Sequence, residues 1–237
     1  VYSFNNHIIY QEGEFKEVIF RDIRDIPITF RGKAKHNVEN ILAATAVAVS
    51  LGIDKKHIVK GLSSFGSKWT DNVGRLNIFQ TIGLKVILDY GHNPAGFEKV
   101  FKFMRTLEGK RLVGIVGLPG DRNDELIIKA GKTIANYLDV VYIKEDQDLR
   151  GRKAGEVADL IKKGILENGY RGVHSYIPLE SEALKIALAN AMPGDIVVCF
   201  YEKNPEKLIR IIRQGMLEFE TKEQILEQKS EKVILVD

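Results

Sequence analysis

The fold is decided by residues 84–94, which read LKVILDYGHNP. Residues 84–88 are apolar except for Lys85, and such a run between turn residues is typical of a buried strand. Asn93 and Pro94 then predict the start of a helix, because Asn is a preferred N-cap and Pro fits the first helical position. The segment indicates a strand that ends at a polar turn, from which a helix begins.

The same alternation continues toward the C-terminus. Further apolar runs lie at 111–116, 140–143, 173–177 and 195–200, and each is followed by an amphipathic stretch. Strands that alternate with helices predict a parallel sheet covered on both faces. We therefore expect an α/β fold, with a Rossmann-like, mostly parallel sheet and helices on both of its faces.

The chain before this region has a different pattern. Residues 5–20 hold two short apolar runs around Gly13, which predict a hairpin. Residues 37–51 are rich in Ala, Val and Leu and predict a helix buried on most sides, with Asn37 as its cap. Asp54 then predicts the cap of a second helix.

The two patterns are separated by residues 63–74, which have no helical or strand period and are interpreted as a linker. We expect two domains, residues 1–66 and residues 67–237. The last segment, 218–237, ends in Val233-Ile234-Leu235-Val236 and predicts a terminal helix with an edge strand, or partial disorder.

The composition is that of an ordinary globular protein. The 237 residues carry 35 basic and 32 acidic side chains, a formal net charge of +3. Without a dense basic stretch there is little reason to expect nucleic-acid binding, and no run reaches the roughly 20 apolar residues that span a membrane. The single cysteine fits a cytoplasmic location. Because no methionine precedes Met104, we expect the chain to be part of a longer protein.

The turn after the first of these strands is the strongest candidate site, since ligands bind at the carboxyl ends of strands in such sheets. Asp89 can accept two ribose hydroxyls, His92 supplies an imidazole, and the helix start at Asn93 offers backbone N–H groups to a phosphate. The alternative is that Asp89 and Asn93 only cap the turn.

Two weaker candidates precede that turn. Arg75 leaves the linker just before the sheet, where it can reach a phosphate, although a lone arginine is usually a solvated surface residue. Asn37 and Asn40 lie three residues apart on one side of a helix start, and an amide can pair with an adenine edge.

Two charged loops also follow strands. Within residues 117–125, Arg122 with Asp121 and Asp124 can orient a zwitterionic amino acid, or form only a helix-capping ion cluster. The second loop, residues 144–153, reads KEDQDLRGRK. Dense alternating charges usually form a solvated loop, but its place at the strand ends favours a functional role.

Taken together, three motifs resemble the Mur ligase family of ATP-dependent amide-bond ligases. They are His36-Asn37-Val38-Glu39-Asn40, Gly74-Arg75, and Asp89-Tyr90-Gly91-His92-Asn93-Pro94. The resemblance implies that residues 1–66 are the end of the family's central ATPase domain and residues 67–237 its C-terminal Rossmann-like domain, with ATP bound between the two domains. Gly91 stands where the family more often has Ala.

The resemblance also implies roles for single residues. Asn40 would contact the adenine with support from Asn37, Arg75 the phosphates, and Asp89 the ribose. His92 and Asn93 would lie near the phosphate and acyl-phosphate region, with His92 as the catalytic candidate. The phosphate loop and the magnesium ligands of the family have no counterpart in this sequence, so the chain alone is expected to be inactive and no metal ligand is assigned to it.

The charged loops resemble a branch of the family that joins arginine to aspartate side chains of a poly-aspartate backbone. The substrate-binding candidates are Asp121, Arg122, Lys144, Glu145, Asp146, Arg150 and Arg152. The expected partners are a small amino acid, arginine above all, and an aspartate-containing polymer or peptide, with a homo-oligomer as a possibility. The alternatives are a ligase for another amino acid and a Rossmann-like module that binds a nucleotide or substrate without catalysis.

Overall fold

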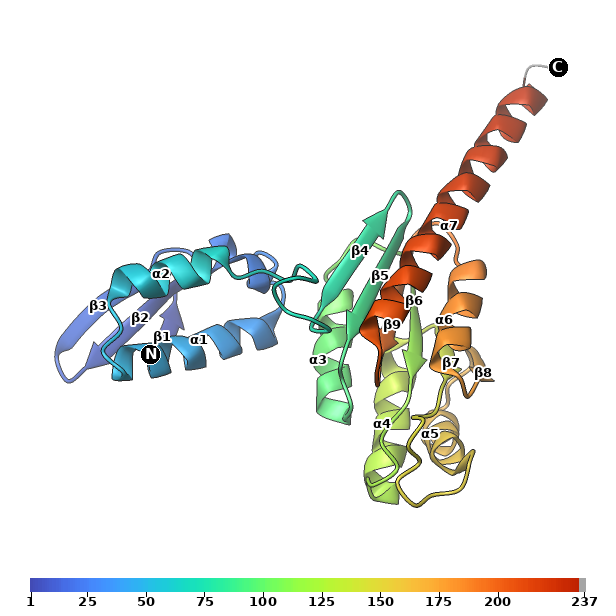
Figure 1. The fold of residues 1–237 in the computed structure, drawn as a ribbon, viewed down its shortest axis with the longest axis horizontal. Helices are drawn as coiled ribbons and strands as arrows, with labels where there is room; N and C mark the ends of the chain where they lie inside the picture. The colour runs from blue at the N-terminus through green and yellow to red at the C-terminus, as the bar shows by residue number, and fades with distance from the viewer. Residues whose placement is uncertain (235–237) are drawn as a thin grey trace. The chain divides into compact units, whose positions relative to one another are not determined.

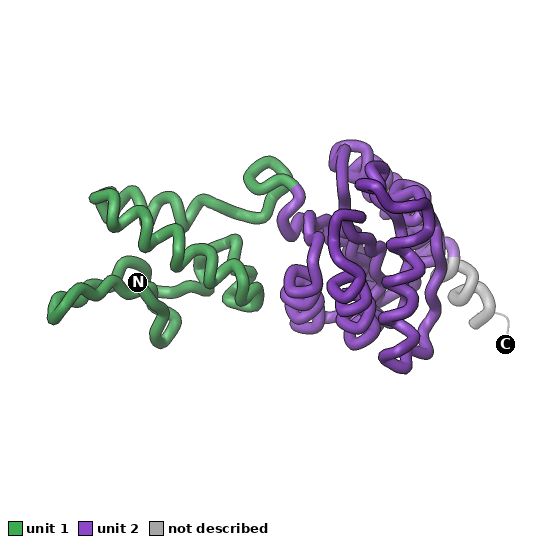
Figure 2. The backbone as a smooth tube through the Cα atoms, turned by 90° about the horizontal axis from the view of Figure 1, so that it is seen from below, with its two compact units in different colours: residues 1–73 green, residues 74–237 purple. Residues whose placement is uncertain are grey.

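The computed structural model describes the backbone of residues 1–234 and the side chains of residues 1–225. It divides into two compact units, Val1–Val73 and Gly74–Asp237 (Figure 2). The boundary thus falls after Val73, and residues 67–73 belong to the first unit. The amides of Asp71 and Asn72 both donate to the Lys68 carbonyl, and an added Cβ at Gly66 would lie 3.2 Å from the Asp71 carboxylate and 3.7 Å from Pro27.

The first unit combines a small antiparallel sheet with two helices. Its elements are β1 (Tyr2–Phe4), β2 (His7–Glu12), β3 (Phe15–Phe20), two 3-10 turns (Ile23–Asp25 and Pro27–Thr29), α1 (Lys35–Ser50) and α2 (Lys55–Ser64). The predicted hairpin is confirmed as β2 and β3, with Gly13 at φ +59° in its turn. A core of seven isoleucines, among them Ile8, Ile41 and Ile58, joins the sheet to both helices.

The helix starts in this unit agree only in part with the sequence. Asp54 is the N-cap of α2, where its side chain accepts from the Lys56 amide at 3.1 Å. The prediction that Asn37 caps α1 is wrong, because the helix begins at Lys35 and its N-cap is Ala34. The Asn37 side chain instead donates to the Ile28 carbonyl at 2.8 Å.

The second unit holds a six-stranded sheet in the order β4-β5-β9-β6-β7-β8 (Figure 1). Its elements are β4 (Asn77–Thr81), β5 (Leu84–Asp89), α3 (Pro94–Met104), β6 (Arg111–Val116), α4 (Asp124–Tyr137), β7 (Val140–Ile143), α5 (Glu156–Glu167), β8 (Val173–Tyr176), α6 (Glu180–Ala189), β9 (Asp195–Phe200) and α7 (Pro205–Ile234). Strands β5 to β9 are parallel, and only β4 is antiparallel. The predicted α/β fold is confirmed.

The strand order places helices on both faces of the sheet. The chain moves in one direction across the sheet from β5 to β8 and then returns to β9. Because parallel crossovers are right-handed, α3, α4 and α5 cover one face, where α4 contacts both of its neighbours. On the same argument α6 covers the other face, and it packs against α7.

Two features of this unit went beyond the sequence prediction. Strand β4 was not expected, although Gly83, at φ +80°, makes the tight turn that joins it to β5. Val233 and Ile234, expected in an edge strand, lie in α7, and Leu235 and Val236 lie outside the described residues. Across the residues that the structure describes, no helix combines the length and apolar character needed to cross a membrane.

Candidate functional site

The turn after β5 is organised around the buried Asp89 carboxylate. One of its oxygens accepts from the Leu76 amide at 2.9 Å and the other from the Gly91 amide at 2.8 Å. Burial raises the pKa of Asp89, against the opposing effect of these two N–H groups and of the nearby Arg75. Asp89 therefore caps the turn, and each of its oxygens keeps a second lone pair with which to accept another donor.

Aromatic rings surround this turn. The Arg75 guanidinium carbon lies 5.3 Å from the centre of the Tyr90 ring, a cation–π distance. Tyr90 also contacts the rings of His92 and Tyr201, with centroid distances of 5.5 Å and 5.3 Å. The Arg75 cation and the His92 imidazole thus both contact the Tyr90 ring, next to the Asp89 turn.

Two glycines let the backbone approach these rings. Gly74 has φ +67°, and an added Cβ would lie 2.0 Å from the Tyr201 hydroxyl. A Cβ at Gly91 would lie 2.7 Å from the Phe200 ring. The Phe200 ring therefore accounts for glycine at position 91.

The helix start that follows has the geometry expected from the sequence. Asn93 is the N-cap of α3, and its side-chain oxygen accepts from the Gly96 amide at 2.8 Å. Pro94 occupies the first helical position. The His92 ring nitrogen Nδ1 lies 3.1 Å from the Tyr90 carbonyl, which fixes the ring close to the N-terminus of α3.

A pocket of about 210 Å³, here called the central pocket, opens at the carboxyl ends of β5, β6, β7 and β9. Its lining includes His92, Arg122, Lys144, Asp146, Arg150 and Glu202. The loops after four different strands thus supply an imidazole, two guanidinium groups and two carboxylates to one small cavity. Such a set can hold both ends of a zwitterion.

A second pocket of about 310 Å³, the outer pocket, lies at the ends of β7, β8 and β9. Its lining includes Glu145, Asp146, Gln147, Glu180, Glu202 and Lys207. Glu145 is held at its rim, since one carboxylate oxygen accepts from the Gly155 amide at 2.6 Å and the other from the Tyr176 hydroxyl at 2.8 Å. Asp146 and Glu202 line both pockets.

Arg152 joins the two charged loops. Its guanidinium donates to the carbonyls of Gly120 and Arg122 at 2.8 Å and 2.7 Å. It also pairs with Asp124 at 2.7 Å and Glu156 at 2.6 Å. The pair of Arg150 and Asp121, at 2.7 Å, adds a more exposed link between the same loops.

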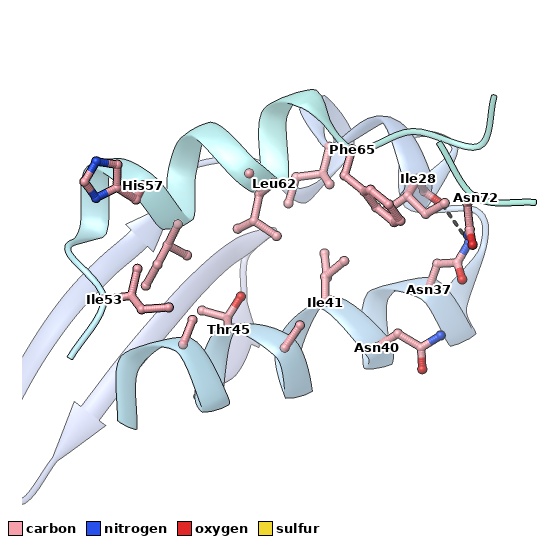
Figure 3. Close-up of a pocket in the computed structure, with 15 residues that line it drawn as sticks. Ile28, Asn37, Asn40, Ile41, Thr45, Ile53, His57, Leu62, Phe65 and Asn72 are labelled. Atoms are coloured by element: carbon pink, nitrogen blue, oxygen red, sulfur yellow. Dashed lines mark hydrogen bonds between the residues drawn. The ribbon is translucent and has the colours of Figure 1, made fainter. Parts of the chain in front are cut away.

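The first unit has a cavity of its own, of about 470 Å³, between α1 and α2 (Figure 3). Asn37 and Asn40 lie at one end of it, Asn37 buried and Asn40 exposed. The remaining lining is mostly apolar, from side chains such as Ile41, Leu62 and Phe65. Asn37 and Asn40 thus lie at the same end of a largely apolar cavity (Figure 3).

Comparison with known proteins identifies the family. Residues 74–200, more than half of the chain, match the family model described as "Mur ligase, glutamate ligase domain". The chain belongs to the Mur ligase family. A cyanophycin synthetase of Crocosphaera subtropica is 38% identical over 88% of this chain. A UDP-N-acetylmuramyl-tripeptide synthetase of Borreliella burgdorferi is 30% identical over 73% of it.

These relatives are much longer than the chain, which spans 23% and 34% of their lengths. A solved structure of MurF from Acinetobacter baumannii shares the fold with a TM-score of 0.57 and 21% identity, over 88% of this chain and 42% of that one. E. coli FolC in complex with DHPP and ADP has a TM-score of 0.52 and 19% identity, over 75% of this chain and 38% of that one.

The structure brings together many of the residues that the Mur ligase resemblance singled out. His92, Arg122, Lys144, Asp146 and Arg150 meet in the central pocket. Glu145 lines only the outer pocket. Asp121 and Arg152 line neither pocket and instead hold the charged loops to each other.

Two site residues were missed by the sequence analysis. Glu202 follows β9 at the same edge of the sheet, so its position after a predicted strand was a usable signal. Glu180 begins α6 and is far in sequence from the other residues of the site. No local pattern marks it, because an acidic residue at a helix start is common.

Proposed function

We propose that the chain is the C-terminal part of a longer ATP-dependent amide-bond ligase. In this ligase, called the full-length ligase below, arginine is joined to aspartate side chains of a poly-aspartate backbone. The observation that carries the proposal is the central pocket, where two arginines and two carboxylates from separate strand ends meet beside the Asp89 turn. The similarity to cyanophycin synthetases over most of the chain supports it.

The proposed reaction has two steps. A carboxylate attacks the γ-phosphorus of ATP and ADP leaves, which gives an acyl phosphate. The amine of the incoming amino acid then attacks the acyl carbon, phosphate leaves, and the nitrogen loses a proton. Such chemistry depends on groups positioned for the developing negative charge.

On this proposal the residues have the nucleotide roles that the Mur ligase resemblance implies. Asp89 accepts hydrogen bonds from the ribose hydroxyls, and Arg75 neutralises phosphate charge. Asn40 contacts the adenine, and Asn37 supports Asn40. His92 and Asn93 lie toward the reacting phosphate, where the N-terminus of α3 favours negative charge.

The amino-acid contacts fall to the central pocket. Arg122 and Arg150 suit the carboxylate of the amino acid, since guanidinium groups bind carboxylates in a two-pronged geometry. Asp146 and Glu202 suit its cationic groups. On the outer side, the carboxylates of the neighbouring pocket favour a positively charged side chain such as that of arginine.

Magnesium is not assigned to residues of this chain. Among the described residues there is no group of three or more His, Cys, Asp or Glu side chains that could hold a metal ion. On this proposal the magnesium ligands belong to other parts of the full-length ligase, and the chain on its own is inactive.

The test is phosphate release by the full-length ligase in the presence of ATP, arginine and an aspartate-containing peptide. Arg75→Ala and Asp89→Ala are each expected to reduce kcat/KM for ATP at least about tenfold, the scale of a lost charged contact. Matched controls are Arg171→Ala and Asp159→Ala, at exposed positions of the same unit. Unchanged kinetics in both test variants would overturn the assigned nucleotide contacts.

A further inference from the structure

A buried ammonium group lies in the wall of the central pocket. The Lys144 side chain is 2% exposed, and its Nζ lies 2.6 Å from an Asp146 oxygen and 3.1 Å from a Glu180 oxygen. Lysine is almost never buried to this extent unless it is paired. Lys144 therefore has two carboxylate partners and little contact with solvent.

Its contacts reach the ends of several strands. Asp146 belongs to the loop after β7, and Glu180 is the first residue of α6, which follows β8. The Glu180 oxygen that pairs with Lys144 also accepts from the Glu202 amide at 2.8 Å, and Glu202 follows β9. One ammonium group thus ties together three loops through a single chain of contacts.

The loop after β6 rests on the same side chain. The Lys144 amide donates to the Val116 carbonyl at 2.8 Å. An added Cβ at Gly117 would lie 2.7 Å from the Lys144 carbonyl oxygen and 2.8 Å from its Cε atom. The methylene chain of Lys144 is therefore packed against Gly117, while its ammonium group is paired with Asp146 and Glu180.

The residues held by Lys144 form the partition between the two pockets. Asp146 and Glu202 each line both the central and the outer pocket. Lys144 holds Asp146 directly and Glu202 through Glu180. If the ammonium group is lost, Asp146 loses its ion pair, and Glu180, which holds the Glu202 amide, loses its cation.

The local charges keep Lys144 protonated. Burial by itself would lower the pKa of Lys144, but Glu180 and Asp146 outweigh that effect and raise it. Glu180 faces Lys144, Asp146 and the Glu202 amide, and burial raises its pKa. Without the ammonium, two carboxylates would face each other in a poorly solvated place, which is unfavourable.

We propose that Lys144 is a positioning residue that fixes the partition between the central and outer pockets, and with it the amino-acid site of the ligase. The proposal rests on the proposed function for its kinetic consequence. It assigns no contact between Lys144 and substrate. A residue that acts through others in this way changes amino-acid binding more than it changes nucleotide binding.

The kinetic test compares Lys144→Met, which keeps the length of the stem, with the milder Glu180→Gln, which keeps an acceptor for the Glu202 amide. Both are expected to raise KM for the amino acid, by about 10- to 100-fold in Lys144→Met, because displacement of binding groups by about 1 Å has effects of that size. KM for ATP is expected to stay within about twofold. Lys153→Met, at an exposed position of the same loop, is the matched control.

The outcomes separate positioning from a merely structural role. A fall in kcat that follows the folded fraction, with KM for the amino acid unchanged, would overturn the proposal, as would normal kinetics in both variants. If the wild-type ligase uses an amino acid other than arginine, the proposal of arginine as the substrate is wrong. The positioning role of Lys144 is then tested by the same KM comparison with that amino acid.

A second measurement needs no activity. Hydrogen exchange of the 237-residue chain should show faster exchange in Lys144→Met at the Glu202 amide and at the Gln147 amide, which donates to the Glu202 carboxylate at 2.7 Å. Strands β5 and β6 should stay as protected as in the wild type. If the wild-type ligase is inactive but these amides lose protection against exchange, the proposed function is wrong and the positioning role of Lys144 stands. Unchanged exchange at both amides would overturn the positioning role.

Discussion

Helices α4 and α5 pack closely through Gly131 and Gly164. We predict that Ala at Gly131 lowers stability, whereas Ala at Gly61, in a helix of the first unit, raises it. An added Cβ at Gly131 would lie 2.2 Å from the Ile161 carbonyl oxygen and 2.9 Å from the Gly164 Cα atom. Both are backbone atoms of α5 and cannot rotate away. Gly61 in α2 has no atom within 4 Å of such a Cβ.

The magnitude follows from these distances. Ordinary contacts between heavy atoms are about 3.5 Å, so Gly131→Ala requires α4 and α5 to separate by about 1 Å. Overpacking of this kind costs about 1–3 kcal/mol, partly offset by the better helix propensity of Ala, worth about 1 kcal/mol. Because the clash is with backbone, we take the upper end of that cost, about 3 kcal/mol, which leaves a net loss of about 2 kcal/mol in the second unit. Gly61→Ala should instead stabilise the first unit by about 0.5–1 kcal/mol.

Hydrogen exchange followed by mass spectrometry is the appropriate assay, because peptides from each unit report their own free energy of opening. Gly131→Ala should lower protection throughout the central strands of the second unit and leave the first unit unchanged. The reasoning would be refuted by wild-type protection in Gly131→Ala, or by lower protection of α2 in Gly61→Ala.

Two further predictions concern the charged loops and the sheet edge. Arg152→Met should lower the stability of the second unit by about 2–3 kcal/mol, because it removes hydrogen bonds from a charged donor to both loops. Thermal unfolding measures this loss, and the control Lys153→Met is expected to match the wild type. Burial and the nearby Asp139 raise the pKa of Tyr170 to about 12 from 10.0, so its contribution to stability is complete below pH 10 and is lost as the pH rises through about 12. Ultraviolet titration of the tyrosines, with Tyr170→Phe as the reference, would contradict this if the Tyr170 component titrated near pH 10.

The central strands were predictable because the sheet is buried on both faces. Strands β5, β6 and β9 are mostly apolar, and every residue of β9 is buried. Asn93-Pro94 marked the start of α3 because both signals act locally. Strand β4 was harder to predict, since most of its residues are half-buried or exposed at an edge of the sheet and no clear period results.

The start of α1 shows a limit of local signals. Asn37 has a residue type suited to an N-cap, but it is needed by the Ile28 carbonyl, nine residues away. A contact of this range overrides the capping preference. The expectation that Asn37 and Asn40 share one side of the helix start needed only the helical spacing. The cavity beside them was not expected.

The charged loops show the other limit. A sequence of alternating charges is typical of a solvated segment, yet Lys144 is among the most deeply buried side chains of the described part of the chain. Its partner Glu180 is separated from it by a helix and a strand. Charge pairs that depend on tertiary structure leave no local pattern, so the anchor of the partition could be found only in the fold.

On the proposed function, the chain belongs to a ligase that activates a carboxylate as an acyl phosphate and joins arginine to it. The most direct measurement is product analysis after the full-length ligase reacts with ATP, arginine and an aspartate-containing peptide. The claim predicts that each arginine found in amide linkage to an aspartate side chain is accompanied by one ADP and one phosphate. AMP and pyrophosphate as products, or ATP consumption without arginine in the peptide, would contradict it.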